Sequence, residues 1–163
     1  MTELIPGIRV AVRALIERDG RVLVQHKVYD NGTERYTLPG GALDLGETLE
    51  QGLRRECFEE LGATVEIDGL YHVADYFKPR DTDPPTKRQQ VEIVFRCHVP
   101  LGYEAGNGPH PDKHQKDVLW LKVSELSHKC FIPRGLSAVI GQSIPDEPEK
   151  LVDSPPVYLG LID

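Results

Sequence analysis

Three glutamates at helical spacing are the side chains in this sequence best suited to chemistry. Glu56, Glu59 and Glu60 stand at positions i, i+3 and i+4, so on a helix they share one face. Like charges at this spacing repel, and a hard divalent cation relieves the repulsion. Mg²⁺ prefers oxygen ligands and is commonly held by one or two carboxylates together with substrate phosphates. Such a face is most often solvated when taken alone, so the neighbouring residues decide between the two interpretations.

The residues around the glutamates favour a metal site. Gly40, Gly41 and Gly46 precede them and permit backbone angles and close approaches that side chains would prevent. A loop of this kind can hold a phosphate or a metal-bound water beside the acidic face. Arg55 lies four residues before Glu59, and we expect an ion pair between them that fixes the carboxylate.

Together, the glycine and glutamate positions resemble the Nudix box. Its pattern is G-x5-E-x7-R-E-U-x-E-E-x-G-U, with U apolar, and every fixed position is matched from Gly41 to Ala63. Cys57 and Ala63 are small for the apolar positions, which bears on packing and not on chemistry. The similarity extends to Leu38-Pro39-Gly40-Gly41 before the box and to Asp117-Val118-Leu119-Trp120-Leu121 after it.

The resemblance covers about residues 7–127 and implies an α/β fold. In this family an α/β/α sandwich surrounds a mixed β-sheet, and the box forms a loop-helix-loop catalytic motif. The resemblance also implies a hydrolase that cleaves a nucleoside diphosphate linked to another group, by attack of water on phosphorus. The implied cofactor is Mg²⁺ or Mn²⁺, which would lower the pKa of bound water and screen the diphosphate from an acidic protein.

The resemblance also assigns roles to residues of the box. Glu56, Glu59 and Glu60 should hold the metal ions, and Arg55 should orient a carboxylate. Gly41 and Glu47 should shape the loop. The predicted catalytic residues are therefore Glu47, Arg55, Glu59 and Glu60.

The general base is left open among several carboxylates. Asp117 is equally well interpreted as a solvated acid at a strand edge, and Glu92 is expected on the exposed, polar face of its strand. The candidates, in order of preference, are Glu59, Glu60, Asp117 and Glu92.

Candidates for substrate binding are Gly40 and Gly41 in the loop and Tyr36, Asp117 and Trp120 outside it. The aromatic pair could stack on a base, although aromatic side chains in a small domain are more often in the core. The spacing of a proline after the box is similar to that in ADP-ribose pyrophosphatases. This slightly favours ADP-ribose or a nucleotide sugar over a nucleoside triphosphate. A nucleotide sensor without catalysis and a purely structural domain stay open as alternatives.

Two further groups of residues could approach a substrate. Four cations between residues 78 and 88 could reach a terminal phosphate, although a solvated loop is the favoured interpretation; they are Lys78, Arg80, Lys87 and Arg88. His110 and His114 lie in a segment rich in glycine and proline and could close over a substrate as a lid.

One strong helix and several strands must position these side chains. The helix is predicted over 48–61, because Thr48 and Gln51 are spaced as a capping box and Gly62 is placed to end it. Asp19-Gly20 between two apolar runs predicts a hairpin of strands 8–16 and 21–25. Shorter strands are predicted over 36–38, 65–77, 91–99 and 118–121, with a helical turn at 124–126 and a helix at 134–140.

The remaining segments are predicted to be irregular. Residues 78–88 and 101–116 lack periodicity, and loops of that length are usually functional or disordered. Residues 142–163 form a proline-rich tail that is expected to wrap the surface or to be partly disordered. We expect a single domain over 1–163 with its core at about 7–141.

Composition limits the partners. The 163 residues carry a formal charge of −7, which argues against general nucleic-acid binding, and no apolar run is long enough to span a membrane. The three cysteines suggest neither a disulfide framework nor a zinc site and are expected to be reduced core residues. We expect a cytoplasmic protein that acts on a small nucleotide, with a homodimer possible because dimers are common among proteins that it resembles.

Overall fold

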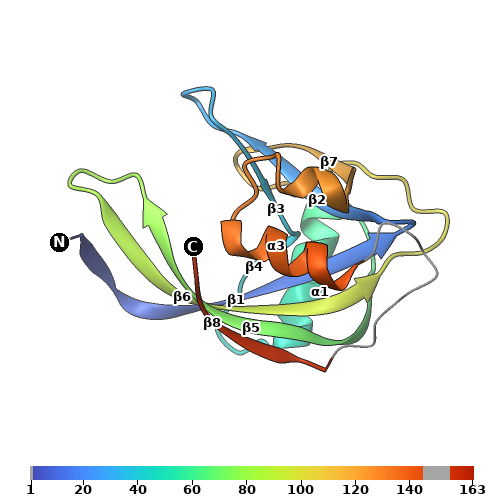
Figure 1. Ribbon diagram of the computed structural model, residues 1–163, viewed down its shortest axis with the longest axis horizontal. Helices are drawn as coiled ribbons and strands as arrows, with labels where there is room; N and C mark the ends of the chain where they lie inside the picture. The colour runs from blue at the N-terminus through green and yellow to red at the C-terminus, as the bar shows by residue number, and fades with distance from the viewer. Residues whose placement is uncertain (1, 145–154) are drawn as a thin grey trace.

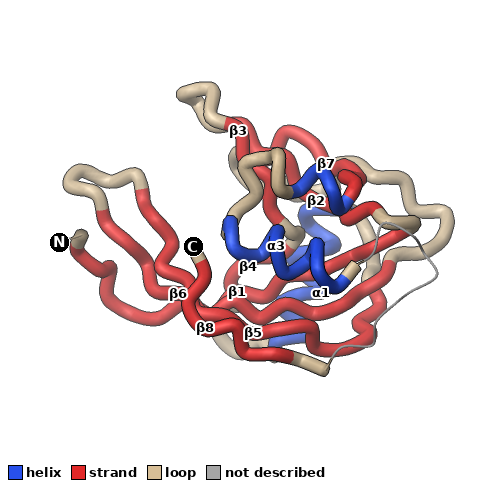
Figure 2. The backbone as a smooth tube through the Cα atoms, in the orientation of Figure 1, coloured by secondary structure: helices blue, strands red, loops and turns tan. Residues whose placement is uncertain are grey.

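The computed structural model describes residues 2–144 and 155–163, and its strands form one mixed sheet between helices (Figures 1 and 2). This is the predicted α/β architecture. The strands are β1 (Glu3–Arg18), β2 (Arg21–Val28), β3 (Glu34–Thr37), β4 (Gly40–Ala42), β5 (Glu66–Arg80), β6 (Thr86–His98), β7 (Gln115–Lys122) and β8 (Val157–Ile162). The helices are α1 (Leu49–Leu61), α2 (Val123–Leu126) and α3 (Arg134–Ser143).

The sheet is built around β1. Its central strand order is β3-β2-β1-β6-β5-β8, while β4 pairs with β1 and β7 pairs with β2. The β1–β6 and β5–β8 pairs are parallel, and the other pairs are antiparallel. The predicted hairpin of β1 and β2 is confirmed, with Asp19 at φ 53° and Gly20 at φ 71° in its two-residue turn. Both central residues have the positive φ that a type I′ turn requires.

The predicted capping of α1 is confirmed. The Thr48 side chain accepts a hydrogen bond from the Gln51 amide, and the Gln51 side chain accepts one from the Thr48 amide. Gly62 ends the helix at φ 65°, where its amide donates to the Phe58 carbonyl. These contacts satisfy backbone groups that the ends of a helix leave unpaired. Among the described residues, no helix has the length and apolar character needed to cross a bilayer.

Both faces of the sheet are covered by apolar packing. Leu53, Cys57 and Leu61 form a buried stripe of α1 that packs on one face, and Leu136 and Ile140 of α3 pack on the other. Figure 1 shows α1 and α3 on opposite sides of the sheet. Because successive residues of a strand point to opposite faces, each long strand contributes to both layers.

The sequence predicted residues 78–88 to be irregular, and this is wrong. β5 continues to Arg80 and β6 begins at Thr86, so most of the segment is a hairpin arm that projects from the body of the protein (Figure 1). The strands were missed because their side chains are mostly polar and cationic, while the pairing rests on backbone hydrogen bonds. Residues 101–114, in contrast, contain no helix or strand in the described structure, as predicted, whereas Gln115 and Lys116, also predicted to be irregular, begin β7.

The ends of the fold also differ from expectation. Gly40–Ala42, where no strand was predicted, pairs with β1 as β4. In the predicted tail, 157–162 form β8 beside β5, whereas 145–154 lie outside the described residues. Cys57 and Cys97 are buried as expected, but Cys130 is exposed.

Leu53 should be essential for anchoring α1. Its side chain is 0% exposed, so L53A should lower the free energy of unfolding by about 2–5 kcal/mol through lost burial and a cavity. Urea denaturation measures this change. Leu45, in the loop before the helix, is fully exposed, and L45A should stay within about 0.5 kcal/mol of the parent. Equal losses in both variants would contradict the packing described.

Candidate active site

A cavity of about 1080 Å³ lies beside the carboxyl half of α1. One wall is formed by the predicted metal ligands and the glycine strand β4: Glu56, Glu59, Glu60, Gly40 and Gly41. The other walls come from β1, from the arm, from the β2–β3 loop and from residues 110–114. The structure therefore brings together residues that are far apart in the sequence.

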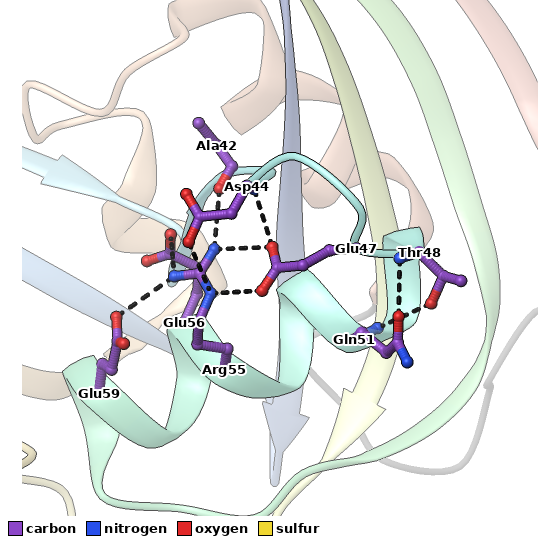
Figure 3. A network of polar contacts seen from close by, with 8 residues as sticks. All are labelled: Ala42, Asp44, Glu47, Thr48, Gln51, Arg55, Glu56 and Glu59. Carbon is purple, nitrogen blue, oxygen red and sulfur yellow. Dashed lines mark hydrogen bonds and ion pairs between the residues drawn. The ribbon is translucent and has the colours of Figure 1, made fainter.

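Arg55 holds the acidic side of α1 in place (Figure 3). Its guanidinium donates to both oxygens of Glu47, at 2.6 and 3.0 Å, and also to the Ala42 carbonyl at 3.0 Å. The same side chain reaches Glu56 at 2.9 Å and Glu59 at 3.3 Å. The expected pair with Glu59 is thus present, but Glu47 is the closer, two-pronged partner.

Glu47 closes the loop before α1. The Asp44 amide donates to its carboxylate at 2.8 Å. The Arg55 hydrogen bonds, together with this amide, lower the Glu47 pKa to about 2. In turn, Glu47 and then Glu56 raise the pKa of Arg55. Both groups are therefore charged at neutral pH, which fixes the loop against the helix.

Glu60 is a buried carboxyl group. It is 4% exposed, and its carboxylate accepts a hydrogen bond from the Gly40 amide at 2.8 Å. Burial raises its pKa to about 7, although the Gln25 side chain, the Gly40 amide and the charge of Arg13 oppose the shift. Gly40 has φ 130°, and a Cβ there would collide with the Val12 carbonyl. Only a glycine at this position can therefore donate its amide to Glu60.

Glu56 lies directly against the second glycine. A Cβ on Gly41 would stand 2.5 Å from the Glu56 carboxylate, so the glycine makes room for this side chain. Burial raises the Glu56 pKa, and Arg55 opposes that rise. Two carboxylates with raised pKa values therefore adjoin the same glycines, where a cation would stabilise their charged forms.

The donor set fits a divalent metal that completes its coordination with substrate oxygens. Three carboxylates line one wall, and burial raises the pKa values of two of them, Glu56 and Glu60. Within residues 2–144 and 155–163, no three acidic, histidine or cysteine side chains lie close enough together to hold a metal ion by themselves. Mg²⁺ is characteristically bound through one or two carboxylates together with substrate phosphates.

The cavity floor is unexpectedly basic. Arg9, Ala11 and Arg13 alternate along β1 with residues that pack toward α1, so the arginines point to the opposite face. Arg13 lies 3.3 Å from Glu92, and it also donates to the Gly40 carbonyl. Glu92 was expected to be exposed, which is wrong: it is 3% exposed and accepts from Gln90 at 2.6 Å. The strand is covered on both faces, so its polar side is not solvated.

Other cations of the cavity come from the arm and from β2 and β3. Lys78 and Arg80 line it from the arm. The favoured interpretation of a solvated loop is wrong for the partly buried Lys78, whereas Arg80 is exposed as expected, although it lies in a strand. Lys27 and Arg35 line it from the other side. These two, like Arg9 and Arg13, were missed by sequence analysis. For Arg9 and Arg13 the available signal was their spacing of four residues, which places both on one face of a strand.

The lid candidates lie at the rim of the cavity. His110 and His114 both line it. The His114 ring stacks on Tyr29 with centroids 4.4 Å apart, and Asp112 pairs with Lys27. Residues 110–114 are therefore tied to β2 and to the loop that follows it.

Three predicted substrate-binding residues lie outside the cavity lining. Tyr36 is 8% exposed and stacks on His26, with centroids 4.7 Å apart. Trp120 packs beside the α1 core and carries Arg18 over its ring at 5.0 Å. The exposed Asp117 carboxylate accepts from the Val118 amide at 2.8 Å. None of the three adjoins the glutamates in the described cavity, so the proposed site leaves them out.

The Glu47–Arg55 pair should make stability depend on acidity. Because the folded Glu47 pKa of about 2 lies below the ordinary value of 4.5, its contribution is present above pH 4.5 and is lost as pH falls toward 2. E47Q should therefore be less stable than the parent at pH 6, and the gap should narrow at pH 3. Urea denaturation at both values measures it.

Glu50 provides the control for this measurement. It is exposed in the first turn of α1 and forms no ion pair with the residues that the structure describes. E50Q should keep the acid dependence of the parent protein. A gap between parent and E47Q that stays constant from pH 6 to pH 3 would show that the pair does not act through charge.

Three known proteins are similar to this chain over half of its length or more. The chain is 39% identical over 142 residues to nucleoside triphosphatase NudI of Enterobacter sp. (strain 638), covering 78% of this chain and 97% of that protein. It is 37% identical over 115 residues to a MutT-like protein of Streptomyces ambofaciens. It is also 35% identical over 90 residues to an ADP-ribose pyrophosphatase of Methanocaldococcus jannaschii. The match to the MutT-like protein covers 71% of this chain and 64% of that protein. The match to the ADP-ribose pyrophosphatase covers 55% of this chain and 50% of that protein.

The fold and the family are shown by two further comparisons. A NUDIX hydrolase from Nitrosomonas europaea has a crystal structure that is similar at a TM-score of 0.68 and 25% identity, over 94% of this chain and 78% of that one. A family model described as NUDIX domain matches residues 7–138. Since that match includes the box, the glycine strand and most of the cavity, this chain belongs to the Nudix family, whose members act on phosphoanhydride bonds.

Proposed function

We propose that this protein is a metal-dependent pyrophosphohydrolase that cleaves a nucleoside diphosphate linked to another group. One observation carries the proposal: the glutamates of α1 face the same cavity as a set of arginines and lysines. A phosphoanhydride needs cations to bind it and carboxylates to hold a metal and activate water. Although the protein has a net charge of −7, its cations and its carboxylates lie together in the lining of this cavity.

Each residue of the acidic wall has a distinct role in the proposal. Glu56, Glu59 and Glu60 would hold Mg²⁺ or Mn²⁺, which supplies a water of lowered pKa and stabilises charge on the phosphoryl oxygens. Glu59 is our first candidate for the general base, because it faces the cavity and its one charged partner among the described residues is Arg55 at 3.3 Å. Arg55 and Glu47 position that carboxylate without contacting the substrate.

Glu60 is the second candidate for the general base. Its pKa of about 7 suits a group that exchanges protons at neutral pH. Its contact with the Gly40 amide places it deeper than Glu59. A bound metal would favour its charged form, so Glu60 is better suited to binding the ion than to accepting the proton.

The group beyond the diphosphate separates two substrate classes. The likeness to an ADP-ribose pyrophosphatase supports ADP-ribose or a nucleotide sugar. The longer match to a nucleoside triphosphatase supports a triphosphate. Sensing of a nucleotide without cleavage is a further alternative, but a sensor has no need of the complete set of box residues, all of which are present here.

Loss of the Glu59 charge should abolish turnover. E59Q should reduce kcat by about 10²–10⁴-fold, the range that a general base contributes, with the thermal midpoint unchanged. The measurement is nucleoside monophosphate release with Mg²⁺, followed by chromatography. E50Q, on the exposed side of the same helix, serves as the matched control and should keep the parent rate. Full activity in a stable E59Q would exclude Glu59 as the base.

Removal of the metal should separate catalysis from sensing. With EDTA, hydrolysis of a nucleotide panel should stop, and excess Mg²⁺ or Mn²⁺ should restore it. Calorimetry with ADP-ribose and Mg²⁺ tests the alternative of a sensor, because it measures binding of the nucleotide. Stable binding with no product for any nucleotide on the panel would favour the sensor and contradict the enzyme.

A further inference from the structure

The floor of the cavity holds a group of cations at the base of the arm. Arg9 comes from β1, and Lys78 and Arg80 come from β5, with β6 between these strands. Arg88 of β6 stands directly opposite Lys78 in the β5–β6 ladder. We call Arg9, Lys78 and Arg80 the arm cluster.

The arm cluster has no carboxylate partner among the residues that the structure describes, whereas three other cations of the site do. Arg13 pairs with Glu92, Lys27 with Asp112, and Arg55 with Glu47. Within residues 2–144 and 155–163, no acidic oxygen lies within 4.0 Å of the charged nitrogens of Arg9, Lys78 or Arg80. Nor does any of the three donate a side-chain hydrogen bond to a described residue. Their donors are therefore available to a ligand.

Holding these charges together is unfavourable without an anion. Burial, followed by repulsion from Arg88, Arg13 and Arg80, lowers the pKa of Arg9. Burial, followed by repulsion from Arg13 and Lys27, lowers the pKa of Lys78 to about 8. A phosphate or carboxylate placed among them would relieve the repulsion and gain charge-assisted hydrogen bonds.

The arm cluster adjoins the acidic wall without belonging to it. Along β1, Arg9 precedes the residues that pair with the glycine strand, and Ala11 stands opposite Ala42. The charge of Glu56 acts on Arg9, so the two walls are close. A nucleotide whose phosphoanhydride lies at Gly40–Gly41 would thus extend its distal group over the arm cluster.

We propose that Arg9, Lys78 and Arg80 form a subsite for an anionic group that the substrate carries beyond the phosphoanhydride that is cleaved. The proposal rests on the proposed function and specifies its substrate class. The distal group is a phosphoryl or carboxylate group, as in a nucleoside triphosphate or a nucleotide with a phosphorylated sugar. A neutral distal sugar, as in ADP-ribose, leaves the arm cluster without a partner.

Matched substrates test this subsite. ATP and ADP-ribose share adenosine diphosphate and differ in the charge of the distal group, and UTP with UDP-glucose repeats the comparison on another base. In R80Q and R9Q, KM for the triphosphate should rise about tenfold, the factor expected for one charge-assisted hydrogen bond. KM for the neutral-sugar partner should change by less than about twofold.

Lys87 provides the matched control. It is exposed on the same arm, it pairs with Pro79 across the hairpin, and it does not line the described cavity. K87Q removes the same charge and should leave both KM values unchanged. Equal losses for charged and neutral distal groups, or an equal effect of K87Q, would overturn the subsite. A parent enzyme that hydrolyses the neutral-sugar nucleotides and not the triphosphates would overturn it as well.

A binding measurement without metal distinguishes failure of the subsite from failure of the proposed function. Inorganic tripolyphosphate in EDTA should raise the thermal midpoint of the parent and of K87Q, and should raise that of R9Q and R80Q less. If no nucleotide is hydrolysed but this pattern holds, the enzyme proposal fails and the anion subsite stands. Equal shifts in all four proteins would reject the subsite even if hydrolysis is found.

Discussion

The close approach of the glycine strand to α1 is the contact on which the site depends. Gly40 donates its amide to a buried carboxylate, and Gly41 leaves room for another. A side chain at Gly40 would collide with the backbone of β1, and one at Gly41 would collide with the Glu56 carboxylate of the helix. The strand is also paired with β1, so this single contact sets the distance between the helix glutamates and the cationic face of the sheet.

Charge separation within the cavity resolves the apparent conflict between an acidic protein and an anionic ligand. The three glutamates come from a helix, whereas the arginines and lysines come largely from strands. Three cations of the site, Arg55, Arg13 and Lys27, are already neutralised by Glu47, Glu92 and Asp112 respectively. The net charge of the chain therefore says little about the field that a bound nucleotide experiences, which is set by the unpaired groups.

Sequence reasoning reached the local parts of this structure more readily than the long-range parts. The capped helix, the Asp19-Gly20 turn and the Arg55–Glu59 pair follow from spacing within a few residues, and all three are present. The burial of Glu92 could not be deduced, because it depends on a partner on β1 and on a second layer above the strand. The arm was missed for a related reason, since polar strands lack the apolar alternation that reveals a sheet.

β1 serves the core and the cavity with alternate residues. Val12, Ala14 and Ile16 belong to the cluster around α1, while Arg9 and Arg13 line the cavity. A slip of one residue in the pairing of this strand would exchange the two sets, burying arginines under the helix and leaving valine and alanine over the ligand. Stability and recognition are thus encoded in one register, so this strand tolerates substitution at its surface far better than insertion or deletion anywhere along its paired length.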